Sequence, residues 1–291
     1  DVTVWNDHVD DIDTLAECLK EAECLVLFRE RTAITAELLA RLPNLKLISQ
    51  RSVYPHVDVE ACTENNVLLC SNMHSDTPSI AASELTFALM LASARQLPQQ
   101  MESLKQGNWQ LAPGQTLQGR RLGLYGYGRI AKQVAGYARA FGMKVWWWAS
   151  DEGRKRLAAD GEVQAATRQS FFSDSDFVSV HVRLKPTTRG IITTEDLLAM
   201  KPSASFINTS RSGLVAQGAL EAALEKGRPG RLALDVFDKE PMTNSDDPLV
   251  NHPHVIATPH IGYVTEDELD FQFSDIYDQI VAYDKGQPIH M

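Results

Sequence analysis

Apolar and polar positions alternate along the chain with two different periods. Short runs rich in β-branched and aromatic residues predict strands, and the segments between them repeat apolar residues at helical spacing. In the N-terminal part, the predicted strands are 2–5, 24–28, 45–48 and 67–70, and the predicted helices are 15–21, 35–41 and 58–64. Strands that alternate with helices in this way predict an α/β fold with a parallel sheet covered on both faces.

The stretch 119–148 has the most informative pattern in the chain. An apolar strand leads into a glycine turn, an amphipathic helix follows, and a second strand covers 144–148. The turn contains Gly126, Gly128 and Ala131 in a G-x-G-x-x-A spacing, which suits a tight turn, a close backbone approach to a pyrophosphate and close helix packing. Free N–H groups at the start of the helix favour phosphate. The stretch therefore predicts a dinucleotide-binding unit.

A helix predicted for 83–96 is apolar nearly all round, so it must be buried. It is either a core helix or one that also joins two domains or packs on a second subunit. Further strands are predicted at 177–181, 204–208, 232–236 and 255–258, and further helices at 193–200, 219–226 and 265–284.

Polar residues follow three of these strands: Arg211, Glu240 and His260. Because ligands bind at the carboxyl ends of parallel strands, the three side chains are expected to converge there. An arginine fork matches a carboxylate, a histidine exchanges a proton near neutral pH, and a neighbouring carboxylate favours its charged form. Together they suit protonation of a carbonyl oxygen while hydride reaches the carbon. Taken singly, each has an ordinary alternative: a surface arginine, an acid at a helix start and a loop histidine.

Charge and composition narrow the class of partner. The chain has 28 Lys and Arg against 38 Asp and Glu, a net charge of −10, so neither nucleic acid nor an anionic membrane surface is an expected partner. No apolar run is long enough for a membrane helix, and there is no signal-peptide pattern. The 4 cysteines lack a C-x-x-C spacing, and three of them lie in apolar segments, which predicts buried thiols in a reducing cytoplasm and no metal site.

Several stretches together resemble the D-isomer-specific 2-hydroxyacid dehydrogenase family. They are 124–131, 141–145, 200–202, 207–211, 234–241 and 258–262, and their order and spacing agree from about residue 85 to the end. The resemblance implies two doubly wound parallel-sheet domains: a flavodoxin-like substrate domain formed by 1–90 and 270–291, and a Rossmann NAD(P) domain formed by 91–269. It also implies an active site in the cleft between them and a homodimer built around the nucleotide domain and the region of Leu85.

The resemblance also implies roles for individual residues. Arg211 matches the substrate-binding arginine, His260 the catalytic acid–base, and Glu240 the carboxylate that orients it. Asp235 matches the residue that contacts the nicotinamide amide. The predicted coenzyme contacts are Gly126, Gly128, Arg129, Ile130, Ser150, His181, Thr209, Asp235 and His260.

The first departure from the family pattern lies in the substrate domain. Members of the family carry a glycine-rich loop there that binds the substrate carboxylate, whereas residues 51–56 of this chain contain no glycine. Arg51, Ser52, Val53 and Tyr54 are therefore candidate substrate contacts. The change leaves room for a substrate that is larger or differently charged than a simple keto acid.

The second departure concerns the coenzyme. The acid that binds the ribose hydroxyls in the family is replaced by Ala149. Ser150 suits either NAD or NADP. Asp151 and Glu152 would repel the 2′-phosphate of NADP, whereas Arg154 and Arg156 would attract it. Both coenzymes stay open, with NADP slightly favoured.

The sequence thus predicts a cytoplasmic NAD(P)-dependent enzyme that interconverts a small 2-keto acid and a D-2-hydroxy acid. One alternative is a non-catalytic NAD(H)-sensing module, like the corepressors that resemble this family; the complete catalytic set argues against it. Another is a reductase for a different oxo group, which the unusual 51–56 segment keeps open.

Overall fold

The computed structural model describes the chain except residues 1, 6, 8, 10, 29–30 and 74–79. The chain divides into two compact units, one formed by 1–78 and 265–291 and the other by 79–264. Both boundaries lie earlier than the predicted ones. Helix α4 (Ala81–Arg95) belongs to the second unit, where its Thr86 bonds to Thr209. Helix α11 (Glu266–Asp284) belongs to the first unit along its whole length.

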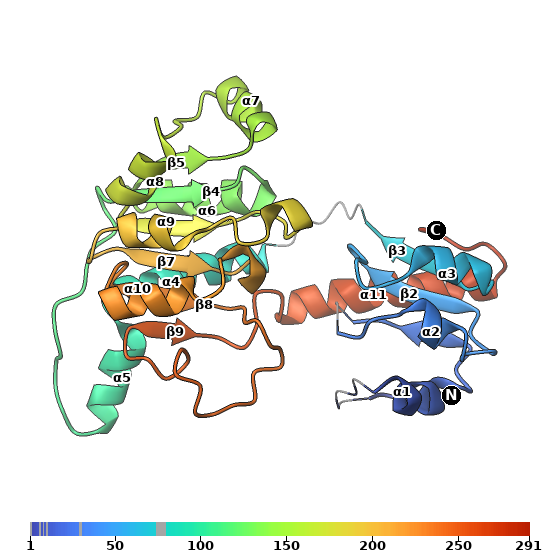
Figure 1. The fold of residues 1–291 in the computed structure, drawn as a ribbon. Coiled ribbons are helices and arrows are strands. Elements are labelled where there is room, and N and C mark those ends of the chain that lie inside the picture. The colour runs from blue at the N-terminus through green and yellow to red at the C-terminus, as the bar shows by residue number, and fades with distance from the viewer. Residues whose placement is uncertain (1, 6, 8, 10, 29–30, 74–79) are drawn as a thin grey trace. The chain divides into compact units, whose positions relative to one another are not determined.

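Within the described residues, the first unit contains a three-stranded parallel sheet, in the order β1-β2-β3, with helices packed against it (Figure 1). Its elements in chain order are α1 (Ile12–Leu19), β1 (Cys24–Val26), α2 (Ala36–Leu39), β2 (Leu47–Arg51), α3 (Val59–Glu64), β3 (Leu68–Asn72) and, from the other end of the chain, α11. Asp11, Thr35 and Asp58 cap the three short helices by accepting a backbone hydrogen bond. Helix α11 is fastened to the central strand, where Ser49 Oγ donates to the Ile276 carbonyl at 2.9 Å.

Residues 2–5 do not form a strand, so the prediction is wrong there. The side chains of Val2 and Val4 are 83% and 73% exposed. Alternating valines satisfy the local strand pattern, but a strand also needs a neighbour that pairs with its backbone. Residues 2–5 pair with none of the described strands.

The second unit is a six-stranded parallel sheet in the order β5-β4-β6-β7-β8-β9, with helices on both faces (Figure 1). Its elements after α4 are α5 (Leu97–Lys105), β4 (Arg121–Tyr125), α6 (Arg129–Ala140), β5 (Lys144–Trp148), α7 (Asp151–Ala159), α8 (Arg168–Asp174), β6 (Phe177–Val180), α9 (Thr194–Ala199), β7 (Ser205–Asn208), α10 (Ala219–Lys226), β8 (Arg231–Leu234) and β9 (Val255–Ala257). The strand order reverses between β4 and β6, and ligands bind at such a switch point. The predicted α/β class with parallel sheets is confirmed.

Strands buried on both faces explain the near-continuous apolar runs of the sequence. On one face Phe87 and Met90 of α4 pack with α6, and on the other Phe171 of α8 belongs to a core that also includes residues of α9 and α10. The tryptophans of β5 alternate between the faces, since Trp147 belongs to the first core and Trp146 to the second. Fully burying one large apolar side chain contributes about 1.5–3 kcal/mol.

The sequence pattern did not predict helices α5, α7 and α8 of this unit. Each is short, and α5 and α7 are mostly polar, so apolar spacing gives little signal. The residues at their N-termini are the better signal: Pro98 lies in the first turn of α5, and Ser150 and Thr167 cap α7 and α8.

Within the described residues, no helix is long and apolar enough to cross a membrane. In the same part of the chain, no group of three or more His, Cys, Asp or Glu residues is placed to hold a metal ion. The cysteines are free thiols: Cys62 and Cys70 are buried, Cys24 is partly buried and Cys18 is exposed. Cys62 and Cys70 thus agree with the prediction of buried thiols, whereas Cys18 is open to solvent.

Candidate active site

The glycine turn lies between β4 and α6, at the switch point of the sheet. Gly126 has a φ of +108°, and a Cβ there would lie 2.3 Å from the carbonyl oxygen of His181, so only glycine fits. Gly128 has extended backbone at the start of α6, and a Cβ there would meet no atom of the described residues within 4 Å. The N-cap residue of α6 is Gly128, which has no side chain to cap the first turn. The open space and the uncapped N–H groups fit a phosphate held by backbone.

An open depression of about 490 Å³ adjoins the turn and is lined by Tyr127, Gly128, Arg129, Lys132, Gln133 and Arg156. Arg129 is exposed, while Ile130 is partly buried against the core beneath. Lys132 pairs with Asp160 at 2.8 Å. The remaining basic side chains give the depression a positive surface, which suits a phosphate-bearing ligand.

The end of β5 lies where a ribose-binding acid is expected. The Ala149 side chain is buried, and a Cβ at Gly153 would lie 2.7 Å from its methyl group. Ser150 is the first exposed polar side chain, and its Oγ accepts a hydrogen bond from Gly153 N–H at 3.3 Å. Arg154 lies over the Trp148 ring at 4.8 Å and donates from Nε to the Ala149 carbonyl at 3.0 Å. Ser150 and Arg154 therefore supply the polar groups at this strand end.

His181 follows β6 and forms the wall behind Gly126. Its backbone N–H donates to the Tyr125 carbonyl at 2.7 Å, and its ring Nε2 lies 2.8 Å from Ser179 Oγ. Burial lowers the pKa of His181 to about 4, so the ring is neutral at physiological pH. His181 therefore contributes shape and hydrogen bonding to this edge without adding charge.

Arg211 is carried on a turn directly after β7. The buried Asn208 shapes that turn, because its Oδ1 accepts from Ser210 N–H at 3.0 Å and its Nδ2 donates to the Arg211 carbonyl at 2.9 Å. The hydroxyl of Thr209 lies 2.6 Å from that of Thr86 on α4. Two predicted site residues, Thr209 and Arg211, are thus held at the carboxyl edge of the sheet.

Glu240 and His260 form the closest pair among the predicted catalytic residues. His260 Nδ1 lies 2.6 Å from Glu240 Oε2, and Glu240 Oε1 accepts a hydrogen bond from Phe237 N–H at 2.8 Å. Burial acts to raise the pKa of Glu240, but the hydrogen bonds from His260 and Phe237 and the positive charges of His260 and Arg211 outweigh it, so this pKa lies below its ordinary value. The Tyr263 ring packs edge-on against the His260 ring. The His260 side chain is 27% exposed, which leaves it accessible to a substrate.

A tight turn formed by residues 258–262 carries His260. The φ of His260 is +52°, and its N–H donates to the Thr258 carbonyl at 2.9 Å. The fully buried Asp235 accepts three hydrogen bonds from this turn: from Thr258 Oγ1 at 2.5 Å, Ile261 N–H at 2.9 Å and Gly262 N–H at 2.9 Å. Asp235 is thus a structural partner of the turn as well as a predicted coenzyme contact.

The predicted substrate residues belong to the first unit. The Arg51 side chain is 10% exposed, and its Nε lies 2.6 Å from Asp275 Oδ2 on α11. Glu268, on the same helix, lies 3.9 Å from Arg51 Nη1. The positive charge of Arg51 is therefore balanced within the unit, which makes Arg51 a weaker candidate for substrate binding than the residues after it.

Ser52 takes over the backbone role that a glycine would have. Its φ is +80°, in the left-handed region, and its N–H donates to the Asn72 carbonyl at 3.1 Å. The loop thus adopts a glycine-type conformation without a glycine, and the exposed Ser52 adds a hydroxyl. Val53 and Tyr54 are partly buried, and Tyr54 packs against the core of the unit.

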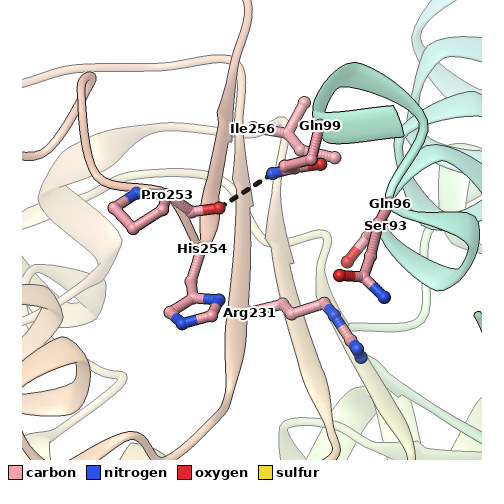
Figure 2. A pocket seen from close by; sticks show the side chains of 7 residues that line it. All are labelled: Ser93, Gln96, Gln99, Arg231, Pro253, His254 and Ile256. Atoms are coloured by element: carbon pink, nitrogen blue, oxygen red, sulfur yellow. Dashed lines mark hydrogen bonds between the residues drawn. The ribbon is translucent and has the colours of Figure 1, made fainter. Parts of the chain in front are cut away.

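A small pocket lies elsewhere in the second unit (Figure 2). Its volume is about 10 Å³, and it is lined by Ser93, Gln96, Gln99, Arg231, Pro253, His254 and Ile256. Figure 2 shows Gln99 donating to the Pro253 carbonyl, at 2.9 Å. Arg231 begins β8 and His254 precedes β9, so the pocket lies at the amino edge of the sheet, away from His260. A cavity of this size holds about one water molecule, so it is not part of the candidate site.

Sequence reasoning missed three residues that shape the site: Thr86, Asn208 and Thr258. Asn208 and Thr258 are polar residues at the ends of apolar strands, which is a signal for a role in the adjoining turn. Thr86 lies inside an apolar helix and gives no comparable signal. Its partner Thr209 becomes visible only when the helix is placed on the sheet.

The fold and the glycine turn define the class of α/β dinucleotide-binding proteins. Residues 87–262 match the sequence profile described as D-isomer specific 2-hydroxyacid dehydrogenase, NAD binding domain. A hydroxypyruvate reductase from Thermotoga maritima is 35% identical over 269 residues, which cover 91% of this chain and 85% of that protein. The chain therefore belongs to the D-isomer specific 2-hydroxyacid dehydrogenase family.

Other relatives differ in length and in named activity. A D-3-phosphoglycerate dehydrogenase from Methanocaldococcus jannaschii is 36% identical over 94% of this chain, but the chain spans only 52% of that relative's length. The crystal structure of a phosphoglycerate oxidoreductase from Vibrio cholerae is 41% identical and has a TM-score of 0.91, covering 98% of this chain and 91% of that one. A D-lactate dehydrogenase from Aquifex aeolicus, complexed with NAD and lactic acid, is 28% identical with a TM-score of 0.74, covering 94% and 86% of the two chains.

Proposed function

We propose that the protein is an NAD(P)-dependent oxidoreductase that interconverts a 2-keto acid and a D-2-hydroxy acid. The observation that carries the proposal is the Glu240–His260 pair, joined at 2.6 Å, on the same sheet edge as the Gly126 turn. Relatives named D-3-phosphoglycerate dehydrogenase, hydroxypyruvate reductase and glyoxylate reductase support it.

Each residue of the site has a defined task in this proposal. The coenzyme, when bound, supplies or accepts a hydride at C2 of the substrate, and backbone N–H groups after Gly128 hold its pyrophosphate. In the reductive direction, Arg211 binds the substrate carboxylate through its guanidinium fork. His260 donates a proton to the carbonyl oxygen. Glu240, kept anionic by its low pKa, stabilises the charged imidazole and fixes its ring.

A panel of keto acids tests the proposal. Glyoxylate, pyruvate, hydroxypyruvate and 3-phosphohydroxypyruvate are offered to the full chain with NADH and with NADPH, and coenzyme oxidation is followed by absorbance. We expect turnover of at least one member that carries a carboxylate beside its carbonyl. No turnover of any member with either coenzyme contradicts the proposal.

For the coenzyme we propose a preference for NADP. Ala149 has no carboxylate to bind the ribose hydroxyls. Arg154 and Arg156, on the following helix, attract a 2′-phosphate, and Asp151 and Glu152 of the same helix repel it. A charge-assisted hydrogen bond contributes roughly 1.5–3 kcal/mol, part of which these acids offset, so we expect NADPH to bind about tenfold more tightly than NADH.

Fluorescence titration of the two reduced coenzymes measures this preference. Arg154→Gln should reduce it, whereas Lys155→Gln, which removes an exposed cation from the same helix, should leave it unchanged. Tighter binding of NADH by the wild type contradicts the preference.

We also propose a homodimer formed through the second unit. Several apolar side chains of α5 and the segment after it are exposed. Figure 1 shows this part of the chain at the side of the unit. The exposed fractions lie between 45% and 76% for Leu97, Met101, Leu104, Trp109 and Leu111. A group of this kind typically marks a protein interface.

Size-exclusion chromatography with light scattering tests the interface. The wild type is expected to elute as a dimer and the double variant Leu104→Glu, Trp109→Glu as a monomer. Val163→Glu, at another exposed apolar position of the same unit, is the control and should stay dimeric. A monomeric wild type contradicts the proposal.

A further inference from the structure

Asp235 follows β8 directly and has no exposed side-chain surface. A buried carboxylate is costly unless it is well hydrogen-bonded. Among the described residues, its donors are one hydroxyl and two backbone N–H groups, all from the 258–262 turn that carries His260. The Asp235 carboxylate therefore holds the 258–262 turn, which carries His260, at the end of β8.

The turn needs such an attachment because of its backbone. His260 has a φ of +52°, which is unfavourable for a residue with a Cβ and persists only where surrounding contacts determine it. Thr258 and Ile261, on either side of His260, both donate to Asp235 Oδ1. Thr258 N–H also donates to the Leu234 carbonyl at 2.9 Å, so main chain and side chain both fasten the turn to the end of β8.

The same strand end also determines the position of Glu240. Glu240 lies on the segment after Asp235 and is folded back, so that its Oε1 accepts from Phe237 N–H. Both members of the Glu240–His260 pair are thus located relative to β8. We propose that Asp235 is a positioning residue, which holds the 258–262 turn so that the His260 imidazole meets Glu240. This inference rests on the proposed function and adds to it a residue that acts through His260.

The positioning role differs from the nicotinamide contact that the family resemblance implies. Oδ1 of Asp235 accepts two hydrogen bonds and Oδ2 accepts one, so Oδ2 alone retains free acceptor capacity for a ligand. A pure coenzyme contact affects coenzyme affinity. A positioning residue affects the geometry of His260 even when no coenzyme is bound.

Asp235→Asn tests the inference, because it keeps the side-chain shape and replaces one acceptor oxygen with a donor group. The NMR spectrum of the coenzyme-free wild type should show a slowly exchanging Nδ1 proton of His260, assigned by its loss in His260→Gln. We expect Asp235→Asn to lose this proton and to lower kcat about a hundredfold, the loss typical of a reacting group displaced by about 1 Å. The loss in kcat at saturating coenzyme should exceed any change in the dissociation constant for the reduced coenzyme.

Two further variants complete the test. Asp238→Asn changes an exposed acid on the same segment and should keep both the His260 proton and kcat. Thr258→Val removes one donor to Asp235 while preserving shape, and should lower kcat by a smaller factor; it decides the question if Asp235→Asn does not fold.

The role is overturned if Asp235→Asn keeps the His260 proton and full kcat, or if it weakens coenzyme binding while kcat at saturation is unchanged. A wild type that reduces no keto acid refutes the proposed function, and the NMR comparison still decides the positioning role.

Discussion

Replacing His260 with glutamine is expected to lower kcat for the reduction of a 2-keto acid by about a thousandfold, since general acid–base catalysis contributes roughly 10²–10⁴-fold. Glutamine has a similar reach and keeps a hydrogen-bonding group toward Glu240, but it cannot transfer the proton. The glycine turn and the end of β5 are untouched, so coenzyme affinity should be preserved. Steady-state kinetics at saturating coenzyme, together with coenzyme titration, measure the two quantities separately.

The matched control for this change is His254→Gln. His254 is exposed and lies at the opposite end of the same strand, β9, so its replacement should leave kcat unchanged. Wild-type turnover by His260→Gln, or equal losses in both variants, contradicts the assignment of His260 as the acid–base group.

Arg211→Gln is expected to lower kcat/KM by about a thousandfold, equivalent to about 4 kcal/mol. That value lies within the roughly 2–5 kcal/mol lost when one partner of a hydrogen-bonded charge pair is truncated. Most of the loss should appear as a higher KM, because the substrate carboxylate loses its cationic partner in the ground state as well as in the transition state. Arg211→Lys should recover only part of it, since an ammonium group lacks the planar fork.

Arg228→Gln serves as the control for the loss of a positive charge. Arg228 is an exposed arginine between α10 and β8, at the amino edge of the same sheet, and its replacement should not change kcat/KM. An Arg211→Gln enzyme with wild-type KM and kcat removes Arg211 from the substrate site.

The parts of the fold that the sequence predicted are those that depend on local pattern. Strands buried on both faces appear as apolar runs, and their carboxyl ends share one edge of a parallel sheet, so the convergence of Glu240 and His260 follows from topology. The glycine turn was predictable for the same reason. Gly126 and Gly128 meet a local requirement for a tight turn and for a close approach of the backbone to a pyrophosphate. Such a requirement can be recognised from a few neighbouring residues in the sequence.

The parts that were not predicted depend on contacts between distant residues. Arg51 is a candidate substrate residue in the sequence, and only the folded structure shows that acids of α11, at the other end of the chain, lie beside it. The hydrogen bonds of Asp235 to the 258–262 turn likewise require the packed structure. Residues 2–5 show the opposite failure, because their alternating pattern is correct for a strand while no described strand pairs with them.

Transfer of a labelled hydride tests the central claim most directly. The protein is given a 2-keto acid from the panel and reduced coenzyme carrying deuterium at C4 of the nicotinamide, and the product is examined by mass spectrometry and chiral chromatography. If Arg211, Glu240 and His260 act as proposed, the product is the D-2-hydroxy acid and carries one deuterium at C2. A product without deuterium, or one of the L configuration, contradicts the account.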